Sequence, residues 1–198
     1  MMTKESKSLT SIDEVRAVLQ QFQDGYTKRE LDALDAFMEL FAEGDGVELI
    51  GTAGLEVGSD EWCLSRLALR KLVENDWQYW GNLVLDVQNA RIHTQADTAW
   101  LATYGTVTYV IEDQDFVRDT FKEVSEIVKR REGSEKIKLL HIQREIAEML
   151  HESGQGDKYV WPIRFTAVLV RQNDLWCFHQ IHFSHATARL PDVRLPAR

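Results

Sequence analysis

The segment RFTAVLVRQNDLWCFHQIHFSHA, residues 164–186, decides the fold because it predicts two strands joined by a tight turn. β-Branched and aromatic residues fill both halves, and polar residues at 172–174 separate them. The second half carries His179, His182 and His185, a spacing that a helix would gather near one face. In a strand, successive side chains alternate between faces, so His182 points away from the other two. We therefore expect no three-histidine metal site, and no cofactor elsewhere in the chain.

The sequence before residue 80 predicts three amphipathic helices. They are expected at residues 11–25, 27–44 and 59–76, where apolar residues recur at helical spacing. Capping-box patterns begin the first two, and a Ser59 cap begins the third. Gly25 is expected to end the first helix, because glycine commonly follows a helix.

Strand patterns frame a charged insert. Residues 47–51 predict a short strand, and residues 83–93 and 98–111 predict a hairpin with a polar turn between them. Residues 115–152 are highly charged but keep apolar residues at helical spacing, which predicts a helical hairpin broken at 132–134. The apolar positions of this insert are Val117, Phe121, Val124 and Val128, then Ile137, Ile142, Ile146 and Met149.

Composition limits the class of protein. A chain of 198 residues with 44% hydrophobic content predicts a single domain, with its core at about 11–187 and an extended arm at 188–198. A net charge of −9 disfavours nucleic-acid partners. We find no signal-peptide or membrane-spanning pattern and expect a soluble, cytoplasmic protein with no membrane partner. Cys63 and Cys177, far apart and in apolar surroundings, are expected to be buried free thiols.

Two segments resemble the SnoaL-like branch of the nuclear-transport-factor-2-like superfamily. Residues 31–62, LDALDAFMELFAEGDGVELIGTAGLEVGSDEW, are similar to its helix, acidic turn, strand and loop. Residues 164–186 are similar to its last hairpin, in which a Trp (Trp176) opens the final strand and a His-x-Ser (His182 and Ser184) closes it. The resemblance implies an α+β fold: a cone-shaped, strongly curved antiparallel sheet whose concave face is covered by N-terminal helices, with a helical insertion at about 115–152.

The final strand also resembles that of the association domain of calcium/calmodulin-dependent protein kinases, an assembly module with an arginine-lined pocket. The positions that align with those arginines hold Gly105, Ala167 and Phe183 here. The anion-binding pocket is therefore not carried over. The departure favours a more apolar cavity inside the cone.

Three residues are candidate acid or base groups. His179 and His182 can exchange protons near neutral pH, although a histidine in an apolar strand is more often a hydrogen-bonded core residue. Asp86 is a candidate carboxylate base with a pKa raised by burial, as isomerases of the superfamily use, or else a solvent-facing side chain.

Six residues are candidate ligand contacts. The aromatic cluster with Trp77 and Trp80 could stack on a flat ligand or close the core. Arg164 could hold a ligand carboxylate or form a surface pair. The resemblance directs Thr103 and Tyr109 inward, and the last strand sends Phe183 to the opposite face from His182, although a single bulge could change which face is inward.

Function stays open among three classes at this point. The first is a protein that binds a small, mostly apolar organic ligand in the cone cavity. The second is an isomerase, cyclase or dehydratase in which a pocket His or Asp moves a proton. The third is an assembly module. A homodimer through the outer sheet face is expected in any case, because Trp100, Tyr104 and Phe178 are expected to lie exposed there.

Overall fold

The chain folds into two compact units, which are described separately. Unit 1 comprises Met1–Val107 and Trp161–Ala186, and unit 2 comprises Thr108–Val160 and Thr187–Arg198. Unit 2 contains the insert that the sequence predicted at 115–152. The computed structural model describes residues 10–44, 46–54, 56–58, 61–110, 113–130, 133–153 and 158–185.

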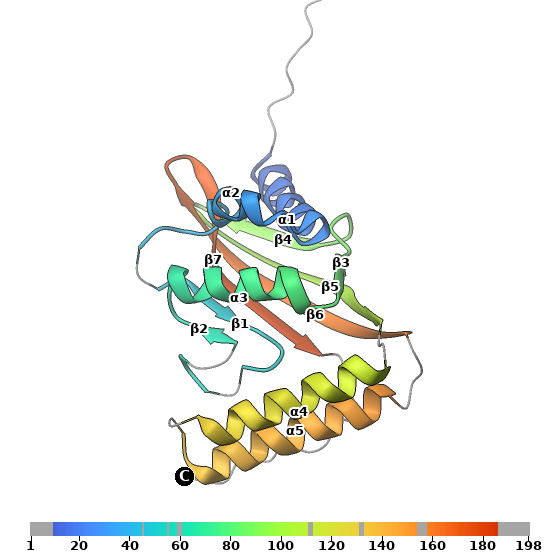
Figure 1. Ribbon diagram of the computed structural model, residues 1–198. Helices are drawn as coiled ribbons and strands as arrows, with labels where there is room; N and C mark the ends of the chain where they lie inside the picture. The colour runs from blue at the N-terminus through green and yellow to red at the C-terminus, as the bar shows by residue number, and fades with distance from the viewer. Residues whose placement is uncertain are drawn as a thin grey trace, which may run out of the picture. The chain divides into compact units, whose positions relative to one another are not determined.

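A seven-stranded, curved and unclosed sheet is the framework (Figure 1). Its order is β2-β1-β7-β6-β5-β3, and β4 pairs with β5. The pairing of β1 with β7 is parallel, so the sheet is not wholly antiparallel as expected. The strands are β1 (Glu48–Ile50), β2 (Trp62–Cys63), β3 (Asn82–Leu85), β4 (Arg91–Gln95), β5 (Thr98–Val110), β6 (Lys158–Gln172) and β7 (Leu175–His185).

The predicted β6–β7 hairpin is confirmed, whereas the strand predicted at 83–93 is broken: β3 and β4 flank residues 86–90, which are not in a strand, and β4 forms the hairpin with β5. In the β6–β7 hairpin, Gln172 pairs with Leu175 across a two-residue turn at Asn173 and Asp174. Both turn residues have positive φ values, 50° and 64°, which Asn and Asp tolerate better than most residues. This turn type matches the natural twist of paired strands, which explains why the polar QND segment predicts the hairpin.

Helix α1 (Ser11–Lys28) starts where predicted but ends later. Thr10 and Asp13 form the capping box at its start. The prediction that Gly25 ends the helix is wrong, because Gly25 serves packing instead: a Cβ built there would lie only 2.4 Å from the Phe37 ring. Arg29, in the left-handed conformation at φ 53°, ends the helix.

The predicted second helix is much shorter than expected. A 3₁₀ turn, η1 (Leu31–Ala33), leads into α2 (Leu34–Met38), and the chain then leaves the helix to join the sheet. The Ala42 N–H donates to the Phe178 carbonyl at 2.9 Å, and the Phe178 N–H donates to the Leu40 carbonyl at 2.8 Å. At these residues the backbone forms hydrogen bonds with β7 in place of the hydrogen bonds of a longer helix. The prediction that the helix extends over residues 39–44 is therefore wrong.

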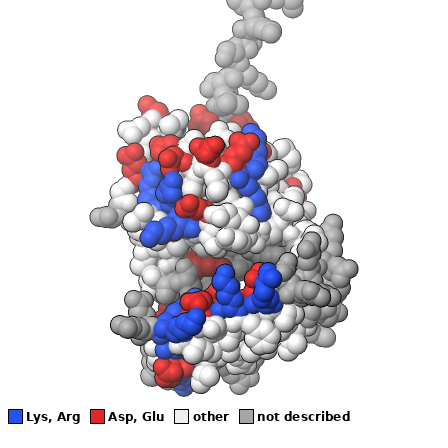
Figure 2. Space-filling view, viewed as in Figure 1, with Lys and Arg blue, Asp and Glu red and all other residues white. Residues whose placement is uncertain are grey.

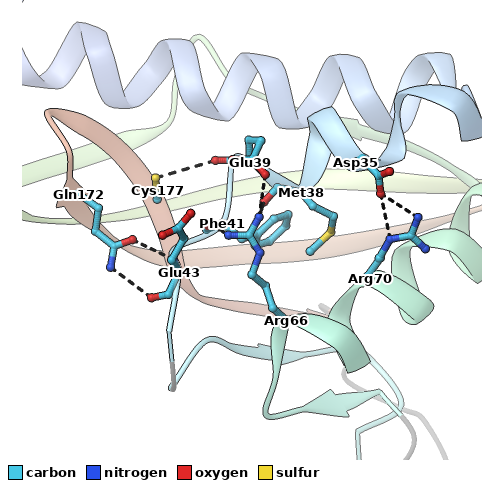
Figure 3. A network of polar contacts seen from close by, with 9 residues as sticks. All are labelled: Asp35, Met38, Glu39, Phe41, Glu43, Arg66, Arg70, Gln172 and Cys177. Carbon is cyan, nitrogen blue, oxygen red and sulfur yellow. Dashed lines mark hydrogen bonds and ion pairs between the residues drawn. The ribbon is translucent and has the colours of Figure 1, made fainter.

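Arg66 donates to backbone carbonyls at the end of α2 and just after it (Figure 3). Its guanidinium donates to the carbonyls of Met38 at 2.9 Å and Phe41 at 3.1 Å, and it pairs with Glu39 at 3.0 Å. Arg70, one helical turn further, donates to Asp35 at 2.8 Å. The third helix therefore holds the second in place through side chains as well as packing.

The third helix, α3 (Arg66–Tyr79), begins later than predicted. Ser59 lies outside the described residues, and Trp62 belongs to strand β2. Ser65 is the cap, since its hydroxyl accepts from the Ala68 N–H at 3.2 Å. Basic and acidic side chains are mixed on the face of unit 1 that Figure 2 shows, with no basic stripe among the described residues there.

The core of unit 1 is built around Phe22. This α1 side chain is fully buried. It lies against rings from α1 itself, from α2 and the residues after it, and from the sheet. Ring centroids are 4.9 to 6.4 Å apart, in tilted or edge-on arrangements that aromatic pairs favour. The partners of Phe22 are Tyr26, Phe37, Phe41, Phe165, Phe178 and Phe183.

Unit 2 is the predicted helical hairpin, made of α4 (Asp113–Lys129) and α5 (Glu135–Ser153). The predicted apolar stripe on α4 is not buried within the chain, since Phe121 is 68% exposed and Val128 is 60% exposed. Ile127 is buried instead. Among the described residues, no helix has the length and apolar character needed to cross a membrane.

We expect Phe22→Ala to lower the free energy of unfolding by about 3–5 kcal/mol, because it removes the shared partner of six rings and leaves a cavity. Urea unfolding followed by circular dichroism measures this. The matched control is Phe121→Ala on the exposed face of α4, for which we expect a change of about 0.5 kcal/mol or less. Equal losses for the two variants would contradict the central role of Phe22.

Candidate functional site

A bulge in β7 decides which of its side chains face the helices. Phe178 pairs with Leu169 and Gln180 pairs with Val168, so His179 has no residue opposite it. The extra residue lets Phe178 and Ile181 both point inward, where each is fully buried. The expectation that Phe178 lies on the outer face is therefore wrong.

The three histidines of β7 are dispersed, as strand geometry predicted. His182 is exposed on the outer face, paired in register with Thr166. His185 lies partly buried beside Trp161, with ring centroids 4.9 Å apart, and burial lowers its pKa. His179 is half-buried at the bulge near Gly46. In the part of the chain that the structure describes, no group of three or more potential metal ligands gathers.

Asp86 does not have the electrostatic setting expected of a buried base. Its carboxylate accepts from the Asn89 side chain at 2.9 Å and from the Asn89 backbone N–H at 3.3 Å. These hydrogen bonds, together with one from the Tyr104 side chain, lower the pKa of Asp86. Of the two alternatives for Asp86, the structure contradicts the pKa raised by burial and agrees with the solvent-facing side chain, because hydrogen bonds at the surface stabilise the charged carboxylate.

Three further candidates do not come together in one place. The Thr103 hydroxyl donates to the Asp86 carbonyl at 2.8 Å, beside the end of β3. Arg164 is exposed and pairs in register with Ser184. The Tyr109 side chain lies outside the described side chains.

Trp80 and Phe183 do lie together, inside the cone. Their ring centroids are 5.6 Å apart in an edge-on arrangement, and Tyr26 is 6.0 Å from Trp80. Phe183 comes from β7 and Trp80 from the end of α3, so this is where the last strand meets the helical layer. Trp77 is buried on the other side of Tyr26 and lines a separate groove.

Next to Trp80 lies a carboxyl–phenol pair that the sequence did not single out. The Tyr26 hydroxyl donates to a carboxylate oxygen of Asp76 at 2.9 Å. Desolvation of the enclosed carboxyl group raises the pKa of Asp76 to about 7, and the nearby Glu61 adds to the increase. The Tyr26 hydrogen bond and the Arg29 charge act in the opposite direction. Burial, followed by the charge of Asp76, raises the pKa of Tyr26 well above 10, so Tyr26 is a neutral donor at physiological pH.

Glu61 is a second acidic side chain at this site, beside Asp76. One of its carboxylate oxygens accepts from the Ala53 N–H at 2.7 Å and from the Thr52 hydroxyl at 3.5 Å. Cys63, two residues further, has its pKa raised to about 11 by burial and by the charges of Asp76 and Glu61. The thiol is therefore protonated at neutral pH, and both cysteines are free and buried, as predicted.

Arg29 holds this site together from the end of α1. Its guanidinium donates to the Tyr26 carbonyl at 2.9 Å, to the Trp80 carbonyl at 2.6 Å and to the Gly81 carbonyl. The last turn of α1 and the last turn of α3 are thereby fixed to each other. Tyr26 and Asp76, one on each helix, meet as a result.

The space that these groups enclose is small. A cavity of about 10 Å³ lies beside Asp76, Glu61 and Trp80, which is room for about one water molecule. The open apolar cavity expected inside the cone is therefore not confirmed in this conformation. The residues that line the cavity of about 10 Å³ are Leu49, Gly51, Thr52, Glu61, Leu72, Asp76, Trp80 and Phe183.

The sequence did contain a signal for this pair. Asp76 follows Leu69 and Val73 at helical spacing, so it is a carboxylate on the buried face of α3. Tyr26 likewise follows Leu19 and Phe22 on the buried face of α1. A charged residue on an apolar helix face needs a partner, but helical spacing alone does not show that the two helices bring these residues together.

We expect Asp76→Asn to remove a pH dependence of stability between about pH 4 and pH 7. In this window the folded protein keeps the Asp76 proton, whereas the unfolded chain, with an ordinary pKa of 3.8, has lost it. Stability therefore falls as pH rises from 4 to 7, by at most about 4 kcal/mol, and levels off above pH 7. Urea unfolding at several pH values measures the slope.

Asp86→Asn is the matched control for this experiment. The Asp86 pKa is lowered, so its contribution is lost only as pH falls toward acid and leaves the slope between pH 4 and 7 unchanged. A slope that persists in Asp76→Asn and disappears in Asp86→Asn would show that the assignment of the buried carboxyl is wrong.

Comparisons with known proteins identify the fold. No protein-family model matches the chain, and no curated protein sequence does. Solved structures do match. A provisionally named dehydratase of the NTF2-like family from Streptomyces avermitilis superposes with a TM-score of 0.55 at 10% identity, covering 89% of this chain and 96% of that one. A ketosteroid isomerase-like protein from Erwinia carotovora atroseptica gives 0.54 at 9% identity, covering 91% and 99%.

A third match carries no assigned function. It is a protein with a cystatin-like fold from Nostoc punctiforme, with a TM-score of 0.52 at 14% identity over 91% of this chain and 96% of that one. All three identities are low, so the likeness concerns the path of the backbone. The chain therefore has the NTF2-like, cystatin-like cone fold that the resemblance implied.

Proposed function

We propose that unit 1 binds a small, mostly apolar organic molecule between the helices and the sheet, and that Asp76 exchanges a proton with it. The observation that carries this proposal is the pairing of Asp76, with a pKa of about 7, and Tyr26 at 2.9 Å beside an aromatic wall. Buried carboxyl groups with a pKa near neutrality are suited to proton transfer, because both forms are populated at physiological pH.

The pair favours chemistry next to a carbonyl group. The Asp76 carboxylate, which lines the cavity, can accept a proton from carbon, while the Tyr26 hydroxyl, which stays protonated, donates its one proton to Asp76 and holds the carboxylate in place. Two solved structures of the same fold carry names that refer to a dehydratase and a ketosteroid isomerase. That likeness supports the reaction class, although it assigns no substrate to this chain.

Ligand entry requires the cavity to widen. About 10 Å³ is too little for an organic molecule, so wall side chains must move apart. Trp80 is suited to this movement, because it follows the last residue of α3 and is only half-buried. Displacing the Trp80 ring would open the wall beside Phe183 while leaving the bond between Tyr26 and Asp76 in place.

The proposal is tested by deuterium exchange into a panel of small cyclic ketones in D2O, followed by ¹H NMR. We expect the α-protons to exchange faster with the protein than with buffer, at a rate that rises through pH 7 as Asp76 ionises. Asp76→Asn should lower the protein-dependent rate by about 100-fold or more, because it removes the base. Tyr26→Phe should move the rise of the rate to higher pH, because it removes the hydrogen bond that lowers the pKa of Asp76.

Asp86→Asn and His179→Ala are the control variants, since Asp86 and His179 lie outside the walls of the interior cavity. Both should retain the wild-type exchange rate. Full activity in Asp76→Asn, or no exchange with any ketone, would contradict the catalytic role. Thermal stabilisation by the same ketones without exchange would instead favour a binding protein.

We also propose that two copies of unit 1 pair through the outer sheet face. Trp100 is 44% exposed and Tyr104 is 64% exposed on β5, and Trp100 stacks on His93 with ring centroids 5.6 Å apart. Large aromatic side chains on a sheet face are costly to leave in water. A hollow of about 360 Å³ beside Trp100, with Thr166 and His182 in its lining, could receive side chains of the second copy.

Light scattering tests the pairing. We expect the wild-type protein to have twice the mass of one chain, and the double variant Trp100→Glu and Tyr104→Glu to have the mass of one. Tyr79→Glu is the matched control, because Tyr79 is 75% exposed at the end of α3, away from the sheet face, and should leave the mass unchanged. A wild-type monomer would rule out the proposed dimer.

A further inference from the structure

Glu61 brings a second carboxylate to the interior cavity, and the local backbone holds it there. Its carboxylate accepts from the Ala53 N–H at 2.7 Å, and its backbone carbonyl accepts from the Gly51 N–H at 2.8 Å. A Cβ built at Gly51 would overlap both the Cβ and the same carboxylate oxygen of Glu61, so a side chain at position 51 would displace this carboxylate. The position of Glu61 is therefore set by its own loop, in advance of any ligand.

Among the described residues, those that line the cavity carry negative charge only. Glu61 and Asp76 are acidic, Thr52 is polar and uncharged, and the rest are apolar side chains or glycine. Hydrogen bonds from Ala53 and Thr52 favour the ionised form of Glu61. The guanidinium of Arg29 lies outside this lining and donates to three backbone carbonyls.

The charge of Glu61 acts on the other groups at the cavity. After desolvation, it is the further cause that raises the pKa of Asp76, whereas the Tyr26 hydrogen bond and the Arg29 charge lower it. The same charge contributes to the raised pKa of Cys63. A carboxylate that opposes the ionisation of Asp76 also opposes any other negative charge in the cavity, because charges interact strongly where little water screens them.

We propose that Glu61 makes the interior site selective for uncharged organic molecules by repelling anions such as carboxylates and phosphates. In this role Glu61 determines specificity through its charge and takes no part in proton transfer. The inference rests on the proposed binding of an organic molecule in unit 1, and it adds the charge class of that molecule. Movement of Trp80 widens the cavity without removing the repulsion, because Glu61 is held by residues 51–53.

Two ketones of similar shape test this selectivity: 4-isopropylcyclohexanone, which is uncharged, and 4-oxocyclohexanecarboxylate, which is an anion. Calorimetry at pH 5.5 compares their affinities for the full chain, because Asp76 is then largely protonated and Glu61 supplies the charge of the wall. We expect the wild-type protein to bind the carboxylate about tenfold or more weakly than the uncharged ketone. Glu61→Gln should strengthen carboxylate binding about tenfold and leave binding of the uncharged ketone nearly unchanged, since glutamine keeps an oxygen that can accept from Ala53.

Glu43→Gln is the matched control, because it removes the same charge from an exposed position outside the cavity and should change neither affinity. Ketone exchange in D2O gives a second readout. Its rise with pH should move to lower pH in Glu61→Gln, because the variant lacks a charge that raises the pKa of Asp76, and should stay in place in Glu43→Gln.

The two proposals for the interior site fail in different ways. Equal affinities of the wild-type protein for the two ketones, an unchanged ratio in Glu61→Gln, or no binding of either ketone would overturn the charge selectivity. Exchange of the uncharged ketone together with equal affinities would leave proton transfer at Asp76 standing. Selective binding that Glu61→Gln abolishes, without exchange of either ketone, would support the role of Glu61 and contradict proton transfer.

Discussion

The packing of aromatic rings around Phe22 is the constraint on which the rest of unit 1 depends. Phe22 lies between the helical layer and the sheet, and its partners come from α1, from α2 and the residues that follow it, and from strands β6 and β7. Gly25, one turn away, gives Phe37 the space to approach α1. The helices therefore lie close to the sheet, and little space remains between the two layers.

This close packing also creates the acid–base pair. Tyr26 is one helical turn after Phe22, so the packing of that ring places its hydroxyl beside the end of α3. Arg29 then fixes the ends of the two helices to each other. Asp76 can be buried because Tyr26 donates to it, yet enough desolvation remains to raise its pKa toward neutrality. The interior chemistry is thus a consequence of how the core is built.

The two faces of the sheet have different roles in the proposed functions. The inner face contributes Phe183 to the interior cavity, whereas the outer face exposes Trp100, Tyr104 and His182. The β7 bulge at His179 maintains this division, because it turns Phe178 inward without moving His182 from the outer face.

The sequence by itself determined much of the local structure: the β6–β7 hairpin, the helical insert, the strand character of 175–185 and the resemblance to the cone fold. Periodicity and turn chemistry act over a few residues, so they can be seen in one sequence. Tertiary structure decided the rest. Packing against Phe37 carried α1 through Gly25, and pairing with β7 ended the second helix early. Asp76 and Tyr26 are fifty residues apart, so only the folded chain brings the carboxyl and the phenol together and gives the carboxyl the desolvation that raises its pKa.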